Sequence, residues 1–188
     1  MHQPRPHLRG ARVELVRPDT SLLPHFTRWE NDAALLRLSD SPSQRPRGGR
    51  GAREMFETLC ASDNPFYGIY TRSGRPIGYI GATIDDRDLR ACLYISIGEA
   101  DARGRGYGTE AMRVLLDHLF REVGLHRAYL FVHETNHRAV RSYEKCGFVV
   151  EGCLREHVRD GREYGAELVM GLLAHEFLAE DQDRGDGG

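Results

Sequence analysis

The sequence predicts a single domain of the mixed α/β class (an α+β mixed sheet), in which helices flank a largely antiparallel sheet with one β-α-β crossover. Three observations lead to this fold class. Short apolar runs separated by polar turns fill the first half of the chain, amphipathic helical patterns alternate with a buried strand in the second half, and a hairpin signal, Asp160-Gly161, lies near the end. The length of 188 residues suits one domain of ordinary size.

The first half of the domain has the patterns of short helices and strands. Residues 12–17 alternate apolar and polar side chains and predict a strand that Pro18 ends. Apolar side chains at helical intervals predict two short helices over residues 21–38 and a third over residues 53–61. Three strand-like runs follow, and the short polar turns between them predict an antiparallel meander over residues 66–71, 77–84 and 89–97.

The second half alternates helices with strands. A glycine-rich segment, residues 98–108, leads into residues 109–123, whose apolar side chains trace one face of a helix that Gly124 ends. Asn136 is typical of the N-cap of a further helix, and Gly147 of its end. The remaining apolar runs predict a buried strand and the two strands of a long hairpin, over residues 127–132, 148–158 and 163–173.

Three segments have the composition of flexible chain. Residues 1–7 lack hydrophobic periodicity, and residues 178–188 are acidic and rich in glycine. Residues 39–53 combine Ser, Pro, Gly and Arg with almost nothing to bury, so we expect a mobile loop inside the domain. The folded domain is therefore expected over residues 8–177.

Composition excludes several classes of protein. Lys and Arg number 26 against 28 Asp and Glu, and this balance gives no global basic field for binding nucleic acid. No apolar run approaches the roughly 18 residues that span a bilayer, and the first ten residues lack the apolar stretch of a secretory signal. The four cysteines are scattered without a C-x-x-C pair, as in proteins with reduced thiols. We expect a cytoplasmic protein that binds neither nucleic acid nor membrane.

The loop between an apolar strand and the longest predicted helix is the first candidate binding site. It reads Arg103-Gly104-Arg105-Gly106-Tyr107-Gly108. Glycines let backbone N–H groups approach an anion, a helix N-terminus carries about half a positive charge, and the two arginines add full charges. The loop therefore predicts a phosphate or pyrophosphate site, with a ligand-free turn as the alternative.

Two known phosphate-binding motifs fit this loop less well. The spacing Gly106-x-Gly108-x-x-Ala111 formally matches the dinucleotide fingerprint, with Glu134 where a ribose-binding acid would lie. An antiparallel meander precedes the loop, however, and too few residues follow it for the remaining parallel strands of that fold. A P-loop is excluded because no Lys-Ser/Thr follows the glycines.

The run His133-Glu134-Thr135-Asn136-His137 matches the zinc-peptidase pattern H-E-x-x-H. In zinc peptidases one helix places both histidines on the same face, with the glutamate as base. Here a strand is predicted over residues 127–132 and a helix from Asn136, so the two histidines lie on either side of a strand–helix junction. We therefore expect no metal site.

Two motifs taken together resemble a known family, the GCN5-related N-acetyltransferases (GNAT). The first is R-G-R-G-Y-G-T-E-A from Arg103, and the second is N-x-x-A-x-x-x-Y-x-K-x-G-F from Asn136 to Phe148. The opening L-R-G-A-R-V-E-L-V-R-P and the closing R-D-G-R-E-Y…L-V-M-G-L-L are similar to the branch of the ribosomal-protein alanine and spermidine N-acetyltransferases. The resemblance covers residues 8–177.

The resemblance implies that acetyl-CoA lies where two parallel strands splay apart, between the strand that ends at residues 95–97 and the strand over residues 128–132. Asn136 matches a family asparagine beside the pantetheine arm, and a helix N-cap explains it equally well. The cofactor-binding residues that the resemblance implies are Ser96, Ile97, Gly98, Arg103, Gly104, Arg105, Gly106, Tyr107, Gly108, Thr109, Asn136, Ala139 and Tyr143.

The resemblance also implies direct attack of an amine on the acetyl carbonyl. Tyr143 matches the family's tyrosine beside the thioester sulfur, where a phenol is a suitable proton donor to the leaving thiolate; a core aromatic is the alternative. A strand bulge at residues 96–98 would free an amide for the oxyanion. Glu99 is the candidate general base, acting through water, with an exposed loop carboxylate as the alternative.

The sequence thus predicts an acetyl-CoA-dependent N-acetyltransferase that modifies a primary amine and uses no metal. A protein N-terminus, a polyamine, an amino acid and an aminoglycoside all remain open as acceptor, and a homodimer is compatible with the resemblance. A non-catalytic acyl-CoA-binding module is the alternative from another class. The acids available to a polyamine pocket are Glu30, Asp32, Asp85 and Asp86.

Overall fold

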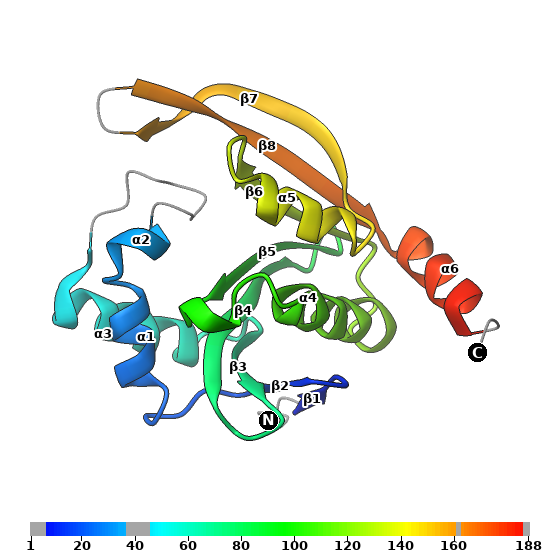
Figure 1. Ribbon diagram of the computed structural model, residues 1–188. Helices are drawn as coiled ribbons and strands as arrows, with labels where there is room; N and C mark the ends of the chain where they lie inside the picture. Colours follow the sequence, from blue (N-terminus) through cyan, green and yellow to red (C-terminus); the bar gives the residue numbers. More distant parts are fainter. Residues whose placement is uncertain (1–6, 37–45, 161–162, 186–188) are drawn as a thin grey trace.

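A single mixed sheet is the frame of the fold. The computed structural model describes residues 7–36, 46–160 and 163–185, in which eight strands follow the order β1-β2-β3-β4-β5-β6-β8-β7 (Figure 1). All neighbours are antiparallel except β5 and β6, which are parallel. The strands are β1 (Leu8–Arg9), β2 (Val13–Val16), β3 (Phe66–Thr71), β4 (Pro76–Asp85), β5 (Arg90–Ile97), β6 (Arg127–His133), β7 (Val149–Asp160) and β8 (Glu163–Leu173).

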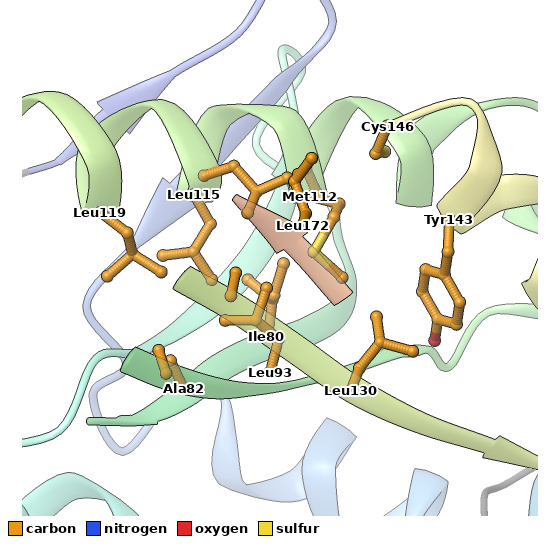
Figure 2. Close-up of a cluster of buried hydrophobic side chains, with 14 of the residues drawn as sticks. Ile80, Ala82, Leu93, Met112, Leu115, Leu119, Leu130, Tyr143, Cys146 and Leu172 are labelled. Carbon is orange, nitrogen blue, oxygen red and sulfur yellow. The ribbon is translucent and has the colours of Figure 1, made fainter. Parts of the chain in front are cut away.

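The two faces of the sheet carry different hydrophobic cores, because successive side chains of a strand point to opposite faces. On β4, Ile80 belongs to the larger core and Tyr79 to the smaller one. The larger core packs against α4 (Tyr107–Asp117) and α5 (His137–Glu144), and Figure 2 shows Met112, Leu115 and Leu119 directed into it. The smaller core is mostly aromatic and packs against α1 (Leu23–Trp29), α2 (Ala33–Leu36) and α3 (Gly48–Ala61).

The long helix that the sequence predicts over residues 109–123 is present. It consists of α4 followed by a π-helical turn, η2 (His118–Glu122). Gly124 ends it with a φ of 81°, a left-handed conformation that glycine adopts without strain. The predicted strands of the meander, the buried strand and the hairpin are confirmed as β3, β4, β5, β6, β7 and β8.

The expectation of a loop over residues 39–53 is wrong for its second part. Helix α3 begins at Gly48, five residues before the predicted start of that helix, while residues 39–45 lie outside the described part. The backbone amide of Gly48 donates to Asn31 Oδ1 (2.7 Å), and Ala52 and Phe56 are buried beneath the helix. These tertiary contacts compensate for the low helix propensity of the glycines at its start.

The end of the chain also differs from its expectation. Residues 178–188 are expected to form a loose acidic end, but α6 (Ala174–Gly185) is helical as far as Gly185. Phe177 anchors its first turn, since its side chain is buried with its ring centroid 5.6 Å from that of Phe120. The short strand β1 is a second element that the sequence analysis missed. Among the described helices, none combines the length and the apolar character that crossing a membrane requires.

Candidate active site

The parallel strands β5 and β6 part from each other along their length. They pair only from Arg90–Arg127 to Cys92–Tyr129, although β5 continues to Ile97 and β6 to His133. The antiparallel neighbours β4 and β8 continue to pair with β5 and β6 over the diverging part. The result is a gap inside the sheet, at the position where the sequence analysis expects splayed strands.

A cavity of about 410 Å³ lies at the diverging end of β5, where Tyr94, Ile95, Ser96 and Ile97 line it. One wall consists of the start of α4 and the side of α5, and the other consists of side chains from α1, α2 and α3. Figure 1 shows these two groups of helices on either side of the diverging strands. The predicted site residues that line the cavity are Ser96, Ile97, Arg103, Gly104, Gly106, Gly108, Thr109, Asn136, Ala139 and Tyr143.

The glycine loop presents an open set of backbone donors. Gly104 and Gly106 have φ values of 73° and 82°, and the left-handed Gly106 is the N-cap of α4. In the described chain, the amides of Tyr107, Gly108 and Thr109 have no backbone carbonyl partner, as expected in the first turn of a helix. These amides and the positive end of the helix dipole can hold an anion.

Arg12, which the sequence analysis missed, fixes this loop to the sheet. Its guanidinium donates to the carbonyl of Arg105 (3.0 Å) and to Glu110 Oε2 (2.8 Å), and its backbone amide donates to Glu110 Oε1 (2.6 Å). The guanidinium also lies over the ring of Tyr107, 5.2 Å from its centroid. The loop is therefore held in its open shape by the chain itself before any ligand binds.

The side chains of the loop lie differently from what the sequence analysis expects, while the backbone amide of Tyr107 stays among the free donors. The guanidinium of Arg103 turns away from the start of α4 and donates to the carbonyls of Ile97 (2.9 Å) and Gly98 (2.6 Å), with Asp32 at 3.7 Å. Arg103 thus stabilises the end of β5, and its charge lies away from the free amides at the start of α4. The side chains of Arg105 and Tyr107 are not among the described residues that line the cavity.

Helix α5 contributes the second set of predicted residues. Asn136 is its N-cap, since its side-chain Oδ1 accepts from the amide of Ala139 (3.2 Å). Tyr143 is almost fully buried, and Figure 2 shows its ring extending from α5 toward Leu130 of β6. A hydrogen bond between the hydroxyls of Thr109 and Ser142 (2.7 Å) joins the first turn of α4 to α5.

Two basic residues of α5 and its basic C-cap residue also line the cavity and were not predicted. Arg138, Arg141 and Lys145 are spaced three and four residues apart, which places them on one face of the helix. Together with the amides of α4 they give this wall a positive character. Their helical spacing is a signal that the sequence analysis did not use.

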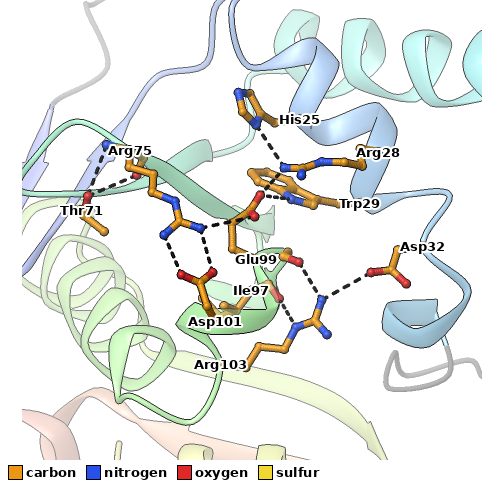
Figure 3. A network of polar contacts seen from close by, with 11 residues as sticks. His25, Arg28, Trp29, Asp32, Thr71, Arg75, Ile97, Glu99, Asp101 and Arg103 are labelled. Atoms are coloured by element: carbon orange, nitrogen blue, oxygen red, sulfur yellow. Dashed lines mark hydrogen bonds and ion pairs between the residues drawn. The ribbon is translucent and has the colours of Figure 1, made fainter.

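Glu99 does not reach the cavity, contrary to its prediction as the general base. Its carboxylate accepts from Arg28 and from the indole Nε1 of Trp29 (2.9 Å), and it lies 3.5 Å from Arg75 (Figure 3). Among the described residues it is absent from the cavity wall. Arg28 and Trp29 belong to α1, and Arg75 lies in the turn before β4. The carboxylate of Glu99 therefore connects the end of β5 to α1 and to this turn.

The bulge expected at residues 96–98 is not inside the regular β4–β5 ladder, whose register runs without a shift from Asp85–Arg90 to Gly78–Ile97. Directly after it, the amide of Glu99 donates to the carbonyl of Ile77 (3.2 Å), where the same register would pair Ile77 with Gly98, so the chain gains one residue at Gly98. The divergence of β5 from β6 also leaves backbone groups of β5 without that neighbour. Gly98 is buried against Trp29, and any side chain there would overlap the indole, so Gly98 has a packing role.

The opposite wall carries a buried acid. Glu30, at the C-cap of α1, accepts from the hydroxyl of Tyr79 (2.6 Å) and from Nε of Arg47 (3.1 Å). Burial, followed by the negative charge of Glu30, raises the pKa of Tyr79 well above its usual value. Tyr79 therefore stays a hydrogen-bond donor at physiological pH. Of the four acids expected for an acceptor pocket, Glu30 alone lines the cavity as described.

The H-E-x-x-H pattern is divided between two elements, as the sequence predicts. His133 ends β6 and His137 begins α5, so a single helical face does not carry both. Glu134 donates its amide to the carbonyl of Ala166 and accepts from the amide of Ala166, which ties it to β8. In the part of the chain that the structure describes, no three His, Cys, Asp or Glu side chains converge as a metal site.

The diverging strands, the glycine loop and α5 lie in a part of the chain that matches a known protein family. Residues 12–149 match the family model of the acetyltransferase (GNAT) domain. The chain belongs to the GNAT family. This match includes the diverging strands, the glycine loop and α5.

Relatives of this GNAT domain include two spermidine N(1)-acetyltransferases. The protein from Escherichia coli (strain K12) is 32% identical over 83 residues, 44% of this chain and 45% of that protein. The protein from Vibrio cholerae is 36% identical over 76 residues, 40% of this chain and 44% of that protein. These two matches span less than half of either relative. A prophage-derived N-acetyltransferase of Bacillus subtilis, YokL, is 26% identical over 146 residues, 78% of this chain and 82% of that protein.

Solved structures share the fold. A spermidine N-acetyltransferase from Vibrio cholerae in complex with CoA and spermine superposes with a TM-score of 0.80 and 22% identity, over 90% of this chain and 99% of that chain. A GNAT acetyltransferase from Bacillus anthracis gives a TM-score of 0.79 and 16% identity, over the same shares of the two chains. At these identities the likeness establishes the fold of the GNAT domain.

Removing the carboxylate of Glu110 tests how the glycine loop is held. Glu110→Ala leaves the amide and the guanidinium of Arg12 without their acceptor, so we expect a loss of about 1–3 kcal/mol in the free energy of unfolding. Glu57→Ala is the control, because Glu57 is an exposed helix residue whose ion pair with Arg53 has its atoms 3.8 Å apart. Urea denaturation measures both, and equal losses would contradict this role of Arg12 and Glu110.

Proposed function

We propose that the protein transfers the acetyl group of acetyl-CoA directly to a primary amine within a ternary complex. The observation that carries this proposal is the shared cavity: a gap between two parallel strands brings free helix amides, a tyrosine and a buried carboxylate to one space. Family membership supports the same reaction type, and the relatives named spermidine N(1)-acetyltransferase support an amine as the acceptor.

The wall formed by α4 and α5 suits the phosphates of coenzyme A. The amides of Tyr107, Gly108 and Thr109 offer hydrogen bonds to a diphosphate, and the helix dipole favours negative charge at the same place. Arg138, Arg141 and Lys145 supply the full charges that the sequence analysis assigned to Arg103 and Arg105. The pantetheine arm would then lie in the gap between β5 and β6, where unpaired strand groups can bind its amides.

Tyr143 is the proposed acid. When the amine nitrogen bonds to the acetyl carbon and the carbon–sulfur bond breaks, the thiolate of coenzyme A leaves with a negative charge. A phenol on the cavity wall can give this thiolate its proton and recover one from solvent. A backbone amide of β5 near Ser96 and Ile97 is the proposed donor to the tetrahedral oxyanion, since both residues line the cavity beside the gap.

Glu30 replaces Glu99 as the proposed carboxylate on the amine side. A neutral amine gains positive charge as it attacks, and a buried carboxylate on the cavity wall stabilises that charge. Glu30 can then receive the surplus proton and pass it to water. Glu99 is unsuited to this role, because among the described residues it is Glu30, and not Glu99, that lines the cavity.

Replacing Tyr143 tests the acid. Tyr143→Phe keeps the buried ring and removes the proton donor, so kcat for thiol release should fall about 100-fold while acetyl-CoA binding is unchanged. Tyr164→Phe, at a residue that is 62% exposed, should leave kcat unaltered. Thiol release is followed with a colorimetric reagent, and binding by calorimetry. An unchanged kcat in Tyr143→Phe would reject the assignment of Tyr143 as the acid.

The wild type tests the alternative function in the same assays. Binding of acetyl-CoA without turnover of any amine would indicate an acyl-CoA-binding module.

Two separate glutamine substitutions, Glu30→Gln and Glu99→Gln, distinguish the roles of the two carboxylates. Glu30→Gln removes the charge beside the attacking amine, and kcat/KM should fall about tenfold or more, which corresponds to about 1.4 kcal/mol. Glu99→Gln should retain kcat/KM within about twofold, with a lower melting temperature because the ion pairs to Arg28 and Arg75 are lost. The reverse pattern would restore Glu99 as the base.

A further inference from the structure

The amine side of the cavity contains a neutral ion pair. Arg47 Nε donates to Glu30 Oε2 (3.1 Å), and both residues line the cavity. The side chain of Glu30 is 6% exposed and that of Arg47 is 40% exposed, so the pair extends from the protein interior to the cavity surface. Tyr79 donates to the other oxygen of Glu30 (2.6 Å) and fixes the orientation of the carboxylate.

This charge arrangement is poorly suited to a polyamine. Glu30 is the single acid among the described residues that line the cavity, and its charge is already balanced by Arg47. Arg103 also lines the cavity, with the carboxylate of Asp32 at 3.7 Å as its counter-charge. A polyamine would bring two or more positive charges to a wall whose net charge is zero or positive, and buried charges need partners.

The same arrangement suits a ligand with one charge of each sign. The bond from Arg47 to Glu30 uses Nε, and the terminal nitrogens of Arg47 have no acceptor among the described residues. Two parallel N–H groups of a guanidinium match the two oxygens of a carboxylate. The carboxylate of Glu30, beside them, favours an amine that acquires positive charge during attack.

The other side chains on the amine side of the cavity are mostly apolar. Trp29, Leu35, Leu36, Met55 and Tyr94 line the cavity around the ion pair. The rings of Trp29 and Tyr79 lie with their centroids 6.5 Å apart, which gives this side a rigid aromatic surface. An aliphatic or aromatic side chain next to the amine would be buried here.

We propose that the acceptor is a zwitterionic amino acid with an apolar side chain, whose carboxylate binds Arg47 and whose amine lies beside Glu30. This inference rests on the proposed acetyl transfer. The α-ammonium first loses one proton through Glu30 to water, which leaves a neutral nitrogen. This nitrogen then bonds to the acetyl carbon and the carbon–sulfur bond breaks, as in that reaction. The thiolate takes a proton from Tyr143, the second amine proton leaves through Glu30 to water, and Tyr143 recovers a proton from solvent.

Three amines test the inference by thiol release. Phenylalanine carries the amine, the carboxylate and an apolar body, phenylalaninamide lacks the charged carboxylate, and spermidine carries positive charges alone. The wild type should have a higher kcat/KM for phenylalanine than for spermidine. Arg47→Gln should raise the KM for phenylalanine about tenfold or more with kcat little changed, because a bidentate charged contact is lost. Its KM for phenylalaninamide should not rise, because this amine has no carboxylate for Arg47 to bind.

Comparing each variant with the wild type on the same amine removes the effect of the amines' different basicities. Arg47→Gln also leaves Glu30 without its balancing charge, so kcat/KM for spermidine should rise about fivefold. Arg50→Gln is the matched control, because Arg50 lies on the same helix with a side chain that is 91% exposed and does not line the described cavity. Arg47→Lys keeps the charge without the planar fork and should restore part of the affinity for phenylalanine.

The outcomes separate this inference from the proposed function. Preference of the wild type for spermidine, or an unchanged KM for phenylalanine in Arg47→Gln, would overturn the inference while leaving acetyl transfer intact. Absence of thiol release with every amine, together with no thermal stabilisation by acetyl-CoA, would overturn the proposed function itself. Thermal stabilisation by acetyl-CoA in each variant also verifies that the variant is folded.

Discussion

The divergence of β5 from β6 is the constraint on which the rest of the structure depends. After Cys92 and Tyr129 the two strands no longer pair, yet each stays bonded to its outer neighbour. Backbone N–H and C=O groups inside a sheet need hydrogen-bond partners. Where β5 and β6 diverge, a ligand in the gap can provide these partners. A thioester-bearing arm with amide groups can complete the interrupted ladder. The divergence therefore accounts both for the cavity and for the kind of molecule that fits it.

The two edges of this gap are held by contacts between distant parts of the chain. On one side, Arg12 and Glu110 fix the glycine loop, and the hydroxyls of Thr109 and Ser142 join α4 to α5. On the other side, Glu99 connects the end of β5 to Arg28 and Trp29 of α1. A site held in this way needs little rearrangement when its ligands bind, which favours affinity and a correctly oriented attack.

Local sequence patterns correctly predicted the strands, helix ends and helix caps that neighbouring residues determine. Period-two alternation marked β2, Gly124 marked the end of the long helix, and Asn136 marked the cap of α5. Features that depend on distant partners could not be read in this way. The start of α3 depends on a hydrogen bond from Gly48 to Asn31, Arg12 and Glu110 are 98 positions apart, and Glu99 is 70 positions from Trp29. The motif of the glycine loop indicated the candidate site, but the direction of the Arg103 side chain is set by carbonyls at the end of β5.

A crystal structure of the protein with bound coenzyme A tests the central claim most directly. The account predicts the diphosphate within hydrogen-bonding distance of the amides of Tyr107, Gly108 and Thr109, and the pantetheine arm between β5 and β6 with its sulfur near Tyr143. Coenzyme bound at another surface, or strands β5 and β6 that pair beyond Cys92 and close the gap in the complex, would contradict it.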